Sequence, residues 1–246
     1  MERSIAQKIR EEILLDYAQK NRKGIYAETS KLMAYNSNRI EGSTLTSEET
    51  ASLFDTGELL ASGNVVYRAR DIEEMNGHFY MFNHALETLH QPLSADLIKS
   101  FHFCLKNGVF EDRANGYAAG EFKQKANIVS DIETASPQEV PERIAQLVDI
   151  YNRILHPELK DLMQFHADYE HIHPFQDGNG RTGRMILFRE CLRNDLVPVI
   201  IRDETKAVYY HALHEAQVNG DVVPLVKYAG QMQELYLKRV RKYFET

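Results

Sequence analysis

Glycine and proline are scarce in this chain. Among 246 residues there are 13 glycines and 7 prolines, about 8% of the chain, whereas the two together average roughly 12% in globular proteins. This shortage excludes collagen-like and glycine-rich chains and argues against architectures built from many strands and turns. Charged residues make up 26% of the sequence. Few breakers and many charges favour helices joined by short loops.

Cysteines and long apolar runs are also lacking. Cys104 and Cys191 are the two cysteines, which excludes a disulfide framework and fits a reducing compartment. No apolar run approaches the roughly 20 residues that a membrane-spanning helix needs. The first residues, MERSIAQKIREE, are charged where a secretory signal would be apolar. We therefore expect a cytoplasmic protein.

A surplus of positive charge is missing as well. Asp and Glu number 36 against 29 Lys and Arg, giving a formal net charge of −7. Bulk nucleic-acid binding calls for a basic surface, so the balance argues against it. Hydrophobic residues reach 43%, too many for a wholly disordered chain. A core of useful size is expected.

Helical spacing of apolar residues runs through most of the sequence. Thr46 and Glu49 form a predicted capping box, Gly108 is a predicted C-cap, and Pro141 suits a first helical turn. The stretch Glu121–Val129 is a candidate hairpin. We predict an all-α fold with a small β-hairpin, divided into an N-terminal helical lobe (1–55) and a main domain (56–246). The predicted helices cover 3–20, 27–36, 67–90, 94–107, a segment from 141, 158–171, 179–194 and two stretches between 204 and 243.

Three of the scarce glycines cluster just before a predicted helix. Gly178, Gly180 and Gly183 fall within six residues. A glycine-rich turn entering a helix leaves free backbone N–H groups at the positive end of the helix dipole, which suits an anion. Asn179, between two of the glycines, tolerates a left-handed backbone. The segment therefore predicts a phosphate-binding nest.

Charged residues around this turn supply further chemistry. Arg181 and Arg184 are three residues apart, so both are expected on one side of the helix, where two guanidinium groups suit a polyphosphate. Asp177 precedes the turn and can hold Mg²⁺. His173, at the end of the preceding helix, can accept a proton as a neutral imidazole. A zinc site built on His166, His171 and His173 is disfavoured, because no cysteine or suitably spaced carboxylate completes it.

The segment from His173 to Arg184, HPFQDGNGRTGR, matches the pattern HxFx[DE]GNGRxxR at every position. It closely resembles the signature of the Fic family, and the resemblance extends over most of residues 35–230. It implies a Fic-type helical bundle that transfers AMP from ATP to a Ser, Thr or Tyr hydroxyl of a target protein. By this resemblance His173 is the general base and Asp177 the Mg²⁺ ligand. The nucleotide-binding residues are Gly178, Asn179, Gly180, Arg181 and Arg184.

A second segment, Ser37–Gly42 (SNRIEG), resembles the inhibitory motif [ST]xxxE[GN] of many Fic proteins. The resemblance implies regulatory roles for Ser37, Glu41 and Gly42, with Glu41 pairing with Arg184. An arginine held by a carboxylate cannot also bind the γ-phosphate of ATP. The alternative is that Ser37–Gly42 is an ordinary helix end.

Family resemblance also implies a β-hairpin flap that aligns the target, and Gly120–Val129 occupies its place. Lys123 stands where the family frequently has arginine, which leaves target docking open. Tyr209 and Tyr210 lie where aromatic residues often approach adenine, although core packing is the stronger expectation for them.

The resulting prediction is an autoinhibited protein adenylyltransferase using Mg-ATP, with an unknown protein target or itself as acceptor. One alternative is an enzyme that removes AMP, with Glu41 orienting water at the same site. Another is a non-catalytic nucleotide-binding adaptor, against which the intact His173 and Asp177 argue. Dimers are frequent in the family, so a homodimer stays open.

Overall fold

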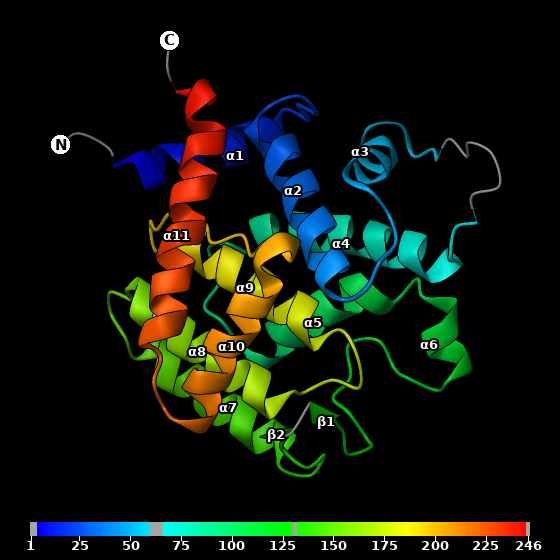
Figure 1. Ribbon diagram of the computed structural model, residues 1–246, viewed down its shortest axis with the longest axis vertical. Helices are drawn as coiled ribbons and strands as arrows, with labels where there is room; N and C mark the ends of the chain where they lie inside the picture. The colour runs from blue at the N-terminus through cyan, green and yellow to red at the C-terminus, as the bar shows by residue number, and fades with distance from the viewer. Residues whose placement is uncertain (1–3, 60–65, 130–131, 245–246) are drawn as a thin grey trace.

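Helices account for nearly all the regular structure in the computed structural model, which describes residues 4–59, 66–129 and 132–244 (Figure 1). This confirms the predicted all-α fold class. The α-helices of these residues are α1 (Ile5–Ala18), α2 (Ile25–Ile40), α3 (Ser47–Thr56), α4 (Ala69–Glu87), α5 (Ala95–Lys106), α6 (Phe110–Ala114), α7 (Val140–Asn152), α8 (Leu159–Ile172), α9 (Asn179–Arg193), α10 (Lys206–Val218) and α11 (Val223–Val240). Strands β1 (Ile128–Val129) and β2 (Ile132–Glu133) pair antiparallel.

Helix α9 lies in the middle of the bundle (Figure 1), packed against α8, α4, α5 and α2. Its buried residues include arginines as well as apolar side chains. A buried charge is costly unless it is paired. Each of these buried arginines therefore needs a hydrogen-bonding or charged partner.

Local sequence signals account for several of the helix starts. The predicted capping box is confirmed: the Thr46 hydroxyl accepts a hydrogen bond from the Glu49 amide, and the Glu49 carboxylate accepts one from the Thr46 amide. Pro141 lies in the first turn of α7, also as predicted. Gly108 is not a left-handed C-cap. Helix α5 ends at Lys106 with Asn107 as its C-cap in the right-handed region, and the short helix α6 begins three residues after Asn107.

Helix α2 is longer than the predicted 27–36. It continues to Ile40 because the polar residues that follow are buried and hydrogen-bonded. The side-chain amides of Asn36 and Asn38 donate to the carbonyl groups of Leu32 and Ala34. This extension carries Glu41, the C-cap residue, to the surface of α9.

The hairpin is shorter and later than predicted. Between Lys123 and Asn127, several hydrogen bonds go to the loop after α8. The Lys123 amide donates to the Pro174 carbonyl (2.8 Å), and the Asn127 side chain donates to the Phe175 carbonyl (3.2 Å). Among the residues that the structure describes, the ladder is formed by 128–129 and 132–133.

One hydrophobic cluster joins the ends of the chain. Ile9 in α1, Phe188 in α9 and Met232 in α11 all belong to it, and α1 lies at the same end of the molecule as the last turns of α11 (Figure 1). The division at residues 55 and 56 stays a prediction. No helix of the described residues is both long and apolar enough to cross a bilayer.

Candidate functional site

The loop between α8 and α9 has two left-handed residues at its ends. His173, the C-cap of α8, has φ 52° and ψ 64°, and Gly178, the N-cap of α9, has φ 81°. A left-handed backbone is uncommon for histidine and points to a functional constraint. Asn179, a residue type that tolerates that conformation, does not adopt it and is the first residue of α9. Its side chain instead braces the loop, accepting from the Phe175 amide (2.7 Å) and donating to the Phe175 carbonyl (2.8 Å).

The imidazole of His173 has one nitrogen ready to accept a proton. Its Nδ1 lies 3.3 Å from the Glu170 carbonyl oxygen. A carbonyl only accepts, so Nδ1 carries the hydrogen and Nε2 keeps its lone pair. Burial lowers the pKa of His173 to about 4, although the bond to Glu170 acts in the opposite direction. The ring is therefore neutral near pH 7.

The three clustered glycines, Gly178, Gly180 and Gly183, have different structural roles. Helix α9 makes its first internal bond from the Thr182 amide to the Gly178 carbonyl (3.0 Å), so the preceding amides are open to an anion. A Cβ at Gly180 would lie 2.5 Å from Glu41 Oε1, so a larger residue there would force that carboxylate to shift. A Cβ at Gly183 would lie 2.3 Å from a Glu170 oxygen. Gly183 thus permits α8 and α9 to pack, and its expected part in an anion nest is wrong.

Arg184 is held by the end of α2. Its Nε donates to the Ser37 hydroxyl (2.9 Å), and Nη2 donates to the Ser37 carbonyl (3.1 Å) and to Glu41 Oε1 (2.6 Å). The guanidinium is 4% exposed. Gly42, with φ 88°, ends the helix immediately after Glu41. The structure thus brings together the two segments that sequence analysis singled out.

Arg181 points to a different partner. It forms an ion pair with Glu74 of α4, and its Nη2 lies 3.5 Å from Asp177 Oδ2. Arg181 pairs with a carboxylate of α4 and Arg184 with one at the end of α2. Both still face these two packed helices, since Arg181 Nη1 also lies 3.5 Å from Asn38 Oδ1 of α2. Each buried guanidinium has a carboxylate partner, as a buried charge requires.

Asp177 is surrounded by cationic groups. Its Oδ2 contacts Lys106 Nζ (2.7 Å), Arg70 Nη2 and Arg181 Nη2. Burial alone would raise the pKa of Asp177, but Arg181 and Lys106 lower it well below its usual range. Within the described residues these contacts all fall on Oδ2. Oδ1 is therefore the oxygen that Asp177 can offer to a further cation.

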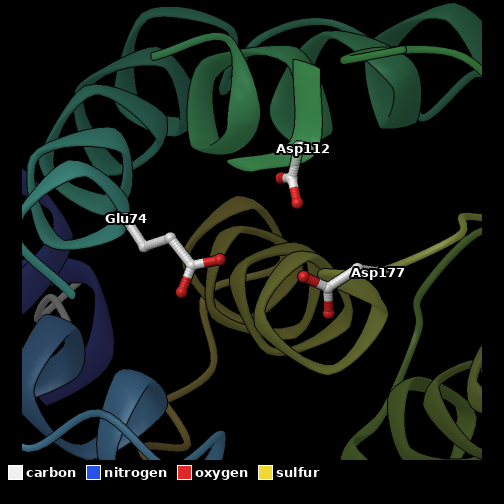
Figure 2. A group of neighbouring side chains, drawn as sticks. All are labelled: Glu74, Asp112 and Asp177. Atoms are coloured by element: carbon white, nitrogen blue, oxygen red, sulfur yellow. The ribbon is translucent and has the colours of Figure 1, made fainter. Parts of the chain in front are cut away.

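Three carboxylates converge at this point, as Figure 2 shows for Glu74, Asp112 and Asp177; one oxygen from each lies within 4.8 Å of the others. Lys106 Nζ lies 2.5 Å from Glu74, 2.6 Å from Asp112 and 2.7 Å from Asp177. Its side chain is 3% exposed. The Lys106 ammonium therefore occupies the position between the three carboxylates, which we call the triad, where a metal ion would otherwise bind. Asp177 Oδ1 is then the one oxygen of the triad left to bind a metal ion.

An open cavity of about 650 Å³ adjoins these groups. Its walls include Glu41, Arg70, Glu74, Asp177 and Arg181. The volume falls within the roughly 300–1,000 Å³ of ordinary ligand pockets. Both cationic and anionic side chains line the cavity, a combination that suits a metal-bound polyphosphate.

The central helices match a known protein family. Residues 92–190 match the model of the Fic/DOC family, a range that contains α5, the loop at 173–178 and most of α9. The chain contains a Fic domain. It is 29% identical over 216 residues to protein adenylyltransferase fic-1 of Caenorhabditis elegans, covering 86% of this chain and 41% of the relative. A protein adenylyltransferase Fic of Nematostella vectensis is 27% identical over 205 residues, covering 81% and 46%. The chain spans less than half the length of these relatives.

Solved structures extend the match beyond the Fic domain itself. A Fic domain-containing signaling protein of Bacteroides thetaiotaomicron superposes with a TM-score of 0.76 at 25% identity, covering 97% of both chains. A fragment of Fic-1 from C. elegans gives 0.74 at 26% identity, covering 98% of this chain and 73% of the fragment. Helices α1–α3 and α10–α11 are therefore shared with other Fic-domain structures.

Several residues of the Fic-domain site were not predicted from the sequence. His102 and Lys106 lie four apart on α5 and both contact Asp177. Their spacing placed them on one face of a helix, but only the fold shows what that face meets. Glu170 is 8% exposed, and burial raises its pKa to about 8.

The two tyrosines considered for adenine differ in position. Tyr209 is buried and its hydroxyl bonds to His166 Nε2 (2.8 Å), which removes it from base stacking and the histidine from any metal cluster. Tyr210 is 45% exposed and stays available to a base.

Proposed function

We propose that this chain is an autoinhibited protein adenylyltransferase that transfers AMP from Mg-ATP to a hydroxyl of a target protein or of itself. The observation that carries the proposal is the neutral, partly buried His173 beside the N-terminus of α9, with its Nδ1 held by the Glu170 carbonyl. A base there stands next to amides and guanidinium groups suited to phosphates. The named relatives, which are protein adenylyltransferases, support the same reaction.

The residues divide the chemistry in a simple way. The target hydroxyl oxygen attacks the α-phosphorus of ATP, and its proton passes to Nε2 of His173. The bond between the α-phosphorus and the bridging oxygen breaks, and pyrophosphate leaves. Amides at the start of α9, with Arg181 and Arg184, balance the charge on the phosphate oxygens. Positioning and charge neutralisation account for most of such catalysis.

Asp177 fits the role of Mg²⁺ ligand. A carboxylate oxygen is the donor that Mg²⁺ prefers, and one or two carboxylates with phosphate oxygens usually suffice. Bound there, Mg²⁺ would draw charge from the phosphates. Lys106, Arg70 and Arg181 keep Asp177 ionised, so its oxygen is always ready to bind.

Glu41 and Ser37 are proposed to restrain the reaction. They engage Arg184 through three hydrogen bonds, so the guanidinium cannot also reach a distal phosphate. A charge-assisted bond is worth about 1.5–3 kcal/mol, which shifts binding by roughly tenfold to a hundredfold. ATP then binds weakly, or in a pose unsuited to in-line attack.

Replacing the base tests the proposal. In a Glu41→Gly background, His173→Ala is expected to abolish transfer of labelled AMP, by about a hundredfold or more. His171→Ala, two residues earlier on α8, is the matched control and should retain transfer. Equal labelling by the His173→Ala protein and its parent would contradict the assignment.

Removal of AMP is the second candidate. The Glu41 side chain is 27% exposed, so its carboxylate can reach a water molecule beside the bound nucleotide. Adenylylated target incubated with wild type and with Glu41→Ala separates the directions: loss of AMP only with wild type favours removal. ATP binding without turnover in any Glu41 variant would instead favour the adaptor.

A further inference from the structure

Helix α5 presents a histidine to the active-site loop that the proposed chemistry does not use. The His102 ring lies flat on Phe175, with centroids 3.9 Å apart and planes at 3°. The side chain is 5% exposed. Phe175 lies between the proposed base, His173, and the proposed metal ligand, Asp177. His102 thus packs against the middle of the loop.

Both nitrogens of His102 are engaged, and each partner fixes its role. Nδ1 accepts from the Gly120 amide (2.9 Å), and Nε2 lies 3.0 Å from the Asp177 carbonyl oxygen. An amide only donates and a carbonyl only accepts, so Nε2 carries the hydrogen. Burial lowers the pKa of His102 to about 3, in keeping with this single neutral form.

Gly120 opens the flap segment, residues 120–127, which leads into the hairpin. It has φ 80°, and a Cβ there would lie 3.1 Å from Phe103 and 3.3 Å from the Lys99 carbonyl. Further along, the Lys123 amide donates to the Pro174 carbonyl (2.8 Å). The flap segment is therefore tied to the active-site loop directly by Lys123 and, through His102, at its first residue.

We propose that His102 is a positioning residue that couples the flap segment to Asp177, so that the placement of the flap and the binding of Mg-ATP depend on each other. One ring nitrogen holds the backbone of Asp177 and the other holds Gly120. Partners of this kind, one step removed from a metal ligand, typically change metal affinity or activity by 10–100-fold when lost. The proposal rests on the proposed function, since it takes Asp177 as the Mg²⁺ ligand.

Three substitutions separate the two arms of the bridge. His102→Gln places a side-chain NH₂ near the position of Nε2 and keeps the bond to Asp177. His102→Asn places an oxygen near Nδ1 and keeps the bond to Gly120. His102→Phe keeps the stack on Phe175 and loses both bonds. Phe175→Leu, which weakens the stack and spares both bonds, serves as the control for packing.

The measurement is ATP affinity by calorimetry at several Mg²⁺ concentrations, in the Glu41→Gly background. We expect half-saturating Mg²⁺ to rise about tenfold in the Phe and Asn variants and less than threefold in the Gln variant. The Asp177 carbonyl ¹³C shift should move in the Phe and Asn variants, and Gly120 amide exchange should quicken in Phe and Gln. If the two ends are coupled, the Asn variant should also show a smaller change in Gly120 amide exchange. The Gln variant should likewise show a smaller change in the Asp177 carbonyl shift.

Equal Mg²⁺ dependence in the Gln and Asn variants, or an unchanged Asp177 signal in the Phe variant, would overturn the proposal. A purely structural role would lower the melting temperature of all three variants without separating them. The proposed function fails separately, if the Glu41→Gly parent itself binds no ATP or shows no effect of Mg²⁺. In that case the Asp177 carbonyl shift and the Gly120 amide exchange still test whether His102 links the two segments.

Discussion

At the scale of single residues, His173 should function as a base at unusually low pH. Burial lowers the pKa of His173 to about 4, below the ordinary histidine value of roughly 6.5, so the ring stays neutral to a lower pH than usual. In the Glu41→Gly protein, the acid limb of kcat/KM should fall near pH 4–5. A pH–rate profile checks this. An acid limb near 6.5 would contradict the burial argument.

The pKa of Glu170 is raised, whereas that of His173 is lowered, and this gives a prediction about stability. In the folded protein its pKa is raised to about 8 by burial, whereas in the unfolded chain it is roughly 4.3. The folded state therefore keeps a proton that the unfolded state releases, and the free energy of unfolding falls as pH rises between these values. Glu170→Gln should remove this loss.

Chemical denaturation at pH 5 and pH 8 measures the effect. The free energy of unfolding of Glu170→Gln, relative to that of wild type, should rise by about 1–3 kcal/mol from pH 5 to pH 8. Glu142→Gln, on the exposed face of α7, is the control and should not change with pH relative to wild type. Parallel curves for wild type and Glu170→Gln would refute the shift.

At the scale of elements, Lys106 joins four parts of the chain. It extends from α5 to Glu74 on α4, Asp112 on α6 and Asp177 before α9. Lys106→Met leaves these carboxylates without their central cation. Removing one partner of a buried charge group costs about 3–5 kcal/mol, so the melting temperature should fall sharply. Added Mg²⁺ should restore part of it, because the triad then resembles a metal site.

Lys99→Met is the matched control for that experiment. Lys99 lies on the same helix and pairs with the exposed Glu121, a surface contact worth about 0–1 kcal/mol. Equal thermal shifts for the two variants, with no response of Lys106→Met to Mg²⁺, would show that the triad does not depend on the ammonium.

Elements also mark where sequence reasoning succeeded. Apolar spacing predicted the long helices, and Thr46, Glu49 and Pro141 located two of the helix starts. It missed the last turn of α2, because Asn36 and Asn38 are stabilised by buried hydrogen bonds that polarity alone does not reveal. It also placed the hairpin too early, since the Lys123 and Asn127 bonds are made to a loop some 50 residues away.

At the scale of the whole molecule, the candidate site depends on contacts across the chain. Glu41 and Arg184 are 143 residues apart in sequence, and their pairing was expected only from resemblance to the Fic family. Lys106 and His102 could not be assigned to the site, because their partners come from four other segments: α4, α6, the flap segment and the loop before α9. The residues within 173–184 were predictable, since one short motif contains them all.

The restraint on Arg184 is the central claim, and comparing Glu41→Gly with wild type tests it most directly. Each protein is incubated with Mg-ATP and a cell lysate, and mass spectrometry reports the transferred group and its acceptor. Glu58→Gly, the same change in an exposed loop, is the control. The account predicts roughly tenfold to a hundredfold more AMP on a hydroxyl side chain with Glu41→Gly. No increase over wild type, or transfer of a group other than AMP, would contradict it.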